Sequence, residues 1–166
     1  MKQGFTLIET LIALTVLIMI IIGPLSLATK SISASILSQN QITASYLAQE
    51  AIEYIINIRD NNFLGGNGWL DGLGLCIPVP DNDKNCCVDV RNDNIKSYPG
   101  QCDYIKYDAS GLYYNYGMGE STIFRRIIKI TRITDYEARI EATVQWSEKF
   151  GGQKSFTLQE DIFDWK

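Results

Sequence analysis

The sequence contains no histidine among its 166 residues. Histidine is the commonest general base and a frequent metal ligand, so its absence excludes histidine-based catalytic triads and histidine-ligated metal sites. No other set of residues suggests catalysis. The sequence therefore predicts a protein that is not an enzyme and that uses no cofactor and no metal.

Positive charge is also scarce. The chain has 15 Lys and Arg against 19 Asp and Glu, a net charge of −4, and no long basic run. Binding to a phosphate backbone needs clustered lysine and arginine. We therefore expect no direct nucleic acid partner, and no small-molecule substrate.

The N-terminal part is almost free of charge. From residue 5 to residue 29 the only charged side chain is Glu9. A helix of about 20 apolar residues spans the hydrocarbon core of a membrane, so residues 5–29 predict a transmembrane helix. Gly23 and Pro24 near its end predict a helix kink, because proline removes one backbone hydrogen bond. The kink is interpreted either as a functional bend or as a passive feature.

A helical pattern continues over residues 30–62 with a changed composition. Residues 31–49 are uncharged and rich in Ser, Ala, Thr, Gln and Asn. An apolar stripe follows at helical spacing, consisting of Leu47, Ala51, Tyr54, Ile55 and Ile58. The run 60–62 is a predicted stop, and Gly65 and Gly66 predict a break. An amphipathic continuation of this kind needs a globular domain to cover its apolar face.

The first fourteen residues, MKQGFTLIETLIAL, carry a specific motif: a short basic leader, a glycine, a phenylalanine, and an acid at the fifth position after the glycine. This motif resembles the class III signal of type IV prepilins and pseudopilins. The resemblance implies a leader of residues 1–4, cut after Gly4 by a prepilin peptidase that then N-methylates Phe5. It also implies that Glu9 meets the N-terminal amine of a neighbouring subunit during assembly.

Two other interpretations of this region remain open. Glu9 near the end of a membrane span can instead extend to the headgroups as an exposed carboxylate. Residues 26–28 can serve as the cut site of an ordinary secretory signal, although Glu9 and the length of the apolar run argue against that signal.

Two later stretches, at residues 45–64 and 136–166, look like minor pilins of the PilV type and like pseudopilin I. The resemblance implies an α+β fold in which a long N-terminal α-helix packs on a small antiparallel β-sheet. The cysteines discussed below add a disulfide-stapled loop to this predicted fold. It implies a single-pass protein of the cytoplasmic membrane whose head, residues 63–166, lies outside the cytoplasm. The protein would then enter a pilus or pseudopilus filament, with other pilin subunits as partners.

Strand signals are concentrated after residue 103. Residues 104–108 and 112–116 flank a turn and predict a hairpin. Residues 124–133 predict a strand, and residues 136–146 alternate, with an apolar face formed by Ala138, Ile140, Ala142, Val144 and Trp146. Residues 155–158 return after a turn at Gly151 and Gly152, whereas residues 60–103 have the composition of a loop.

Four cysteines, at positions 76, 86, 87 and 102, lie beyond the membrane segment, where an even number predicts disulfides. A bond between the adjacent Cys86 and Cys87 would close a strained ring. Two pairings remain open: Cys76–Cys86 with Cys87–Cys102, or Cys76–Cys87 with Cys86–Cys102. A zinc site and reduced thiols are the alternatives.

Residues 81–94 begin like a calcium loop, with Asp81 and Asp83. The pattern then fails, because Cys86 stands where glycine is needed and Asn92 stands where glutamate should close the site. Calcium binding in this loop is left open.

The first functional hypothesis is a minor pilin or pseudopilin that builds or primes a filament. The second is a membrane-anchored receptor or adhesin whose loop 65–120 binds a ligand, with tyrosines 104, 107, 113, 114 and 116 as an adhesive surface. Alternation in a sheet also explains these tyrosines without a ligand. A secreted enzyme with a cleaved signal is the third hypothesis, and the lack of any catalytic arrangement opposes it.

Overall fold

The computed structural model describes residues 6–78, 85–98, 101–148 and 152–164. The chain divides into two compact units, Met1–Asn40 and Gln41–Lys166, and each is described by itself. Helix α1, Leu7–Leu64, supplies residues to both units. The predicted α+β class, with one long N-terminal helix, antiparallel sheets and a disulfide-stapled loop, is confirmed. The predicted leader, residues 1–4, lies outside the described residues.

Helix α1 ends later than the run at residues 60–62 predicts. It continues to Leu64, and the chain then turns at Gly66, which has a φ of +72°. The amide of Asn67 donates to the carbonyl of Asn62, and the amide of Gly66 donates to that of Phe63. This is a Schellman motif, and glycine adopts its left-handed position without a steric cost. The glycine pair was therefore the correct stop signal, and the asparagines belong to the last turn.

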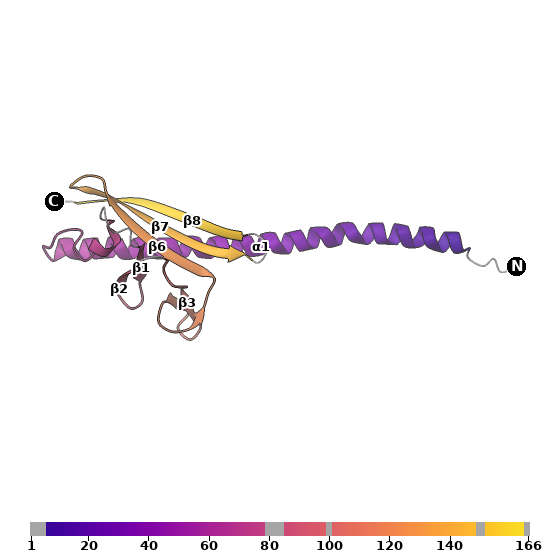
Figure 1. Cartoon of the computed structure of the whole chain (residues 1–166), viewed down its shortest axis with the longest axis horizontal. Coiled ribbons are helices and arrows are strands. Elements are labelled where there is room, and N and C mark those ends of the chain that lie inside the picture. Colours follow the sequence, from indigo (N-terminus) through magenta and orange to yellow (C-terminus); the bar gives the residue numbers. More distant parts are fainter. Residues whose placement is uncertain (1–5, 79–84, 99–100, 149–151, 165–166) are drawn as a thin grey trace. The chain divides into compact units, whose positions relative to one another are not determined.

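The main sheet of the second unit has five strands in the order β2-β1-β6-β7-β8, and every neighbouring pair is antiparallel (Figure 1). The strands are β1 Asn85–Asp89, β2 Asn94–Tyr98, β6 Phe124–Arg132, β7 Glu137–Glu148 and β8 Gly152–Phe163. The long strands β6, β7 and β8 pair in sequence, as expected for a meander with short turns. Strand β1 joins β6 through one pair of residues, Cys86 and Ile128.

The core of this unit lies between α1 and one face of the main sheet. On α1 the buried residues are Ala44, Leu47, Ala48, Ala51, Ile52 and Ile55. On β7 the buried residues are Ala138, Ile140, Ala142, Val144 and Trp146, the face that the alternation predicts. The predicted stripe on the helix is confirmed at Leu47, Ala51 and Ile55, whereas Tyr54 and Ile58 are only partly buried at its edge.

Two parts of the strand prediction were wrong. Residues 85–98 form the hairpin β1–β2, not loop. Cys86, Cys87 and Val88 are all buried, so β1 is covered on both faces and shows no alternation that a sequence pattern can detect. Strand β8 extends from Gly152 to Phe163, well beyond the predicted residues 155–158, because its pairing with β7 decides its length. Gly151, the other half of the predicted turn, lies outside the described residues.

A small three-stranded sheet in the order β4-β3-β5 completes the unit. Its strands are β3 Lys106–Asp108, β4 Tyr113–Asn115 and β5 Glu120–Ser121. The pairing of β3 with β4 confirms the hairpin predicted on either side of residues 109–111.

Both disulfides are present, as Cys76–Cys86 and Cys87–Cys102. Cys76 belongs to the 3₁₀ helix η1, Gly74–Cys76, and its bond joins the segment after α1 to strand β1. Cys102 joins the segment before β3 to the same strand. The bonds thus hold the hairpin β1–β2 from both sides. Within the part of the chain that the structure describes, this hairpin has only one paired position with the rest of the sheet.

Reduction is expected to release the hairpin β1–β2 first. The two bonds close loops with sequence separations of 10 and 15 residues, and each loop closure is worth about 3 kcal/mol in the chain-entropy model. Hydrogen exchange of the full chain with and without reductant should show amides 85–98 exchanging on the order of a hundredfold faster, with β7 protection unchanged. A simultaneous loss of protection in β7 would contradict this order of events.

Candidate functional site

The predicted cleavage and methylation sites, Gly4 and Phe5, lie outside the described residues. Glu9 is described, and it lies exposed in the first turn of α1. Its amide donates to the carbonyl of Thr6 at 3.1 Å. A carboxylate in the first helical turn interacts favourably with the helix dipole. None of the three ion pairs found in the described part of the chain includes Glu9, so its side chain is accessible to a partner from outside.

The predicted kink residues, Gly23 and Pro24, lie inside α1, which is helical on both sides of them. Proline nevertheless lacks the amide that would bond to the carbonyl of Ile20, which weakens the helix locally. A bend at this position stays a prediction.

The N-terminal half of α1 exposes its apolar side chains. Every residue from 6 to 36 is exposed in the first unit, including Leu7, Ile18 and Ile22. The hydroxyls of Thr10, Thr15 and Thr29 donate to carbonyls of the preceding turn, so these polar groups are satisfied within the helix. By length and composition, α1 is able to cross a membrane. A signal sequence near an N-terminus can have the same length and apolar composition.

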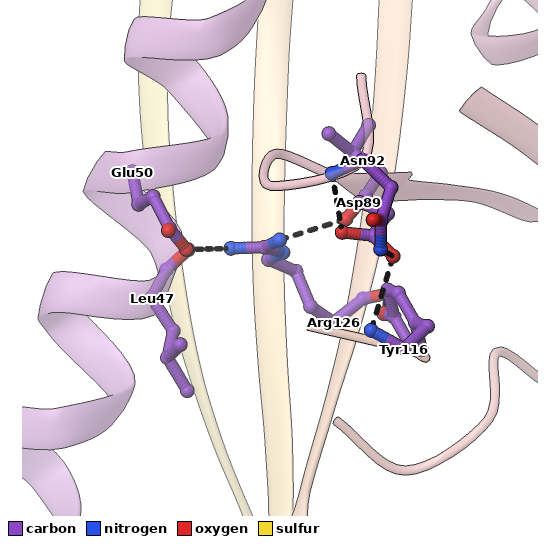
Figure 2. Close-up of polar contacts among 7 residues, drawn as sticks. Leu47, Glu50, Asp89, Asn92, Tyr116 and Arg126 are labelled. Atoms are coloured by element: carbon purple, nitrogen blue, oxygen red, sulfur yellow. Dashed lines mark hydrogen bonds and ion pairs between the residues drawn. The ribbon is translucent and has the colours of Figure 1, made fainter. Parts of the chain in front are cut away.

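The second unit holds a buried arginine, Arg126 of β6, whose side chain is 3% exposed. One guanidinium nitrogen donates to the Leu47 carbonyl at 2.8 Å and to the Glu50 carboxylate at 2.7 Å. The other terminal nitrogen, Nη2, donates to the Val88 carbonyl at 2.7 Å. Figure 2 shows the guanidinium between α1 and strand β1. Arg126 therefore ties together three elements that are far apart in the sequence: α1, β6 and the hairpin β1–β2.

The turn of the hairpin β1–β2 is fixed by two further acids. Asp89, which is buried, accepts hydrogen bonds from the backbone and side-chain amides of Asn92 and from the backbone amide of Tyr116 (Figure 2). Asp93 accepts a hydrogen bond of 2.7 Å from the Tyr54 hydroxyl of α1. Burial, and then this bond, raise the pKa of Tyr54 well above its ordinary value, so the phenol remains a donor at neutral pH.

The sequence interpretation missed Arg126 and Glu50. Glu50 lies beside the apolar stripe rather than within it. The signal for Arg126 was available, since Phe124, Ile128 and Ile130 alternate and Arg126 occupies the same phase. An arginine on the inward face of a strand indicates a buried charge that needs an acidic partner. The alternation in β6 does not show where on α1 this acidic residue lies.

The five tyrosines that form the predicted adhesive surface are largely engaged within the molecule. Tyr107 and Tyr114 pack with ring centroids 5.1 Å apart. The guanidinium of Arg91 lies 4.7 Å from the Tyr113 ring centroid, and that of Arg125 lies 4.0 Å from the Tyr104 centroid. These contacts are those of a packed sheet, which favours the interpretation that needs no ligand.

The cysteines are not available as thiolate ligands for zinc, because all four are in disulfides. Asp81 and Asp83, the start of the predicted calcium loop, lie outside the described residues. Among residues 6–78, 85–98, 101–148 and 152–164, no group of three or more acidic or cysteine side chains is arranged to hold a metal ion.

No family model, no curated protein and no solved structure matches this chain.

Proposed function

We propose that this protein is a minor pilin or pseudopilin, a structural subunit or assembly primer of a type IV pilus or of a filament like that of type II secretion. The observation that carries the proposal is the N-terminal motif: Gly4, then Phe5, then Glu9 as the only charge in an apolar run of 25 residues, 5–29. The long helix and its covering sheet are compatible with that role.

In this proposal the chain is stored in the cytoplasmic membrane with its head outside the cytoplasm. A prepilin peptidase removes residues 1–4 and methylates the new amine of Phe5. The subunit then joins other pilin subunits in a filament. The exposed apolar surface of residues 6–36 supports this sequence of states, because it suits both a lipid environment and a bundle of neighbouring helices.

Mass spectrometry of the mature N-terminus tests the proposal. A chain that begins at N-methylated Phe5 supports it. An intact Met1 would indicate a membrane-anchored receptor or adhesin instead, and a start at Thr29 would indicate a secreted protein released by an ordinary signal peptidase.

Replacing Glu9 with alanine is expected to preserve membrane insertion and to impair assembly. Insertion should be equal or better, because a carboxylate in a membrane helix costs up to about 2.5–3.5 kcal/mol. Assembly should fall about tenfold or more, since a hydrogen bond to a charged group is worth about 1.5–3 kcal/mol. The measurement is the ratio of subunit in sheared filaments to subunit in membranes.

Thr10→Ala is the matched control for Glu9→Ala, because it changes the next residue without removing a charge. Normal filament incorporation of the Glu9→Ala variant would refute the pairing of Glu9 with an amine.

A further inference from the structure

An acidic groove lies on the second unit between α1 and β4. Its volume is about 470 Å³, and its walls include Tyr46, Leu47, Glu50 and Glu53 of α1 and Tyr114 of β4. Glu50 and Glu53 are three residues apart, so both carboxylates lie on one face of the helix. Tyr46 is 68% exposed beside them. The groove thus combines two carboxylates with aromatic rings.

The two carboxylates differ in their partners. Glu50 is paired with Arg126 at 2.7 Å. Glu53 accepts a hydrogen bond of 2.9 Å from the Gln49 side-chain amide, and no ion pair of the described part of the chain includes it. Carboxylates at this spacing on a helix repel each other. An ammonium group at Glu53 would relieve that repulsion, and aromatic rings also attract ammonium ions.

A neighbouring α1 helix has one cation that suits this groove. Between Lys2 and Arg59, Lys30 is the only lysine or arginine in the sequence, and residues 31–49 carry no charge. Lys30 is exposed. A parallel packing of two copies that is offset along α1 by the separation of Lys30 and Glu53 therefore brings Lys30, and no other cation between Lys2 and Arg59, toward the acidic groove.

We propose that the acidic groove receives the Lys30 ammonium of a second copy of this chain. This inference rests on the proposed function, which packs the α1 helices of different subunits in parallel. Lys30 precedes Glu50 and Glu53 by 20 and 23 residues, so the copies are offset along the helix axis by about 30–35 Å at 1.5 Å per residue. Copies anchored at the same level in one membrane cannot adopt that offset. The contact therefore belongs to subunits that have left the resting membrane state.

The test is a zero-length carbodiimide coupling of full-length protein in detergent, where no membrane plane fixes the level of the two copies. One tagged copy carries Lys30→Gln and keeps Glu53, and a second copy with a different tag carries Glu53→Gln and keeps Lys30. In their mixture, a bond between Lys30 and Glu53 forms only between different molecules. Peptide mapping identifies the bond.

We expect a Lys30–Glu53 peptide from the wild type and from the mixture. Either variant alone lacks one of the two reacting side chains and gives no such peptide. Lys154→Gln, which removes an exposed lysine on β8, is the matched control and should leave the yield unchanged. Absence of the Lys30–Glu53 peptide from wild-type protein would overturn the inference. Coupling of Glu53 to other amines with equal yield would also overturn it.

The results of this experiment can be distinguished from those of the N-terminal mass spectrometry that tests the proposed function. An N-methylated Phe5 without the Lys30–Glu53 bond refutes the groove contact and leaves the filament role intact. The bond together with an intact Met1 retains the contact between copies and refutes the filament role.

Discussion

Replacing Gly4 with valine is expected to leave the leader attached and to exclude the protein from filaments. In the proposed function a prepilin peptidase cuts directly after Gly4, and a branched side chain at this position would block its access. Without cleavage, Phe5 gains no free amine, and Glu9 has no cation to meet during assembly. The apolar run remains unchanged, so membrane insertion should not be affected.

The intact mass of the Gly4→Val protein is the measurement, and it should retain residues 1–4 in essentially all molecules. Gln3→Ala is the control, since it changes the neighbouring leader residue without altering the scissile position. A Gly4→Val protein of normal mature mass would show that a prepilin peptidase does not process this chain.

Replacing Arg126 with alanine is expected to lower the free energy of unfolding of the second unit by about 3–5 kcal/mol, because each of the two carbonyls left without its donor costs about 1–3 kcal/mol and the lost side chain leaves a cavity. The substitution removes donors from the Leu47 and Val88 carbonyls and from Glu50. Because the Glu50 side chain is 37% exposed, water screens its charge and reduces its share of the loss. The larger share comes from the two carbonyls and from the cavity that the side chain leaves.

Denaturant unfolding of the full chain in detergent, followed by the fluorescence of the buried Trp69 and Trp146, measures this change. Arg132→Ala on the same strand is the matched control, because Arg132 is exposed and its loss should cost less than about 0.5 kcal/mol. Arg126→Met should recover part of the stability, since it refills the space without a charge. A cost below about 1 kcal/mol for Arg126→Ala would show that the three hydrogen bonds do not hold the elements together.

Local patterns in the sequence were sufficient for elements whose environment is simple. The apolar run of residues 5–29, in which Glu9 is the only charge, predicts a long helix because a membrane helix needs apolar residues all round. Alternation over residues 136–146 predicts the buried face of β7 because one side of that strand faces the core and the other faces solvent. The cysteine count predicts disulfides, and their spacing reduces three pairings to two.

The hairpin β1–β2, the pairing of the cysteines and the site of Arg126 were decided only by the tertiary structure. Strand β1 is buried on both faces, so its sequence shows no alternation of apolar and polar residues. One of its two cysteines is bonded to Cys76, which precedes the strand, and the other to Cys102, which follows it. Arg126 meets Leu47 and Glu50, which lie 79 and 76 residues earlier in the chain. Periodicity reports which face of an element is buried. It carries no information about which distant residues meet there, because that choice depends on how helix and sheet pack as whole elements.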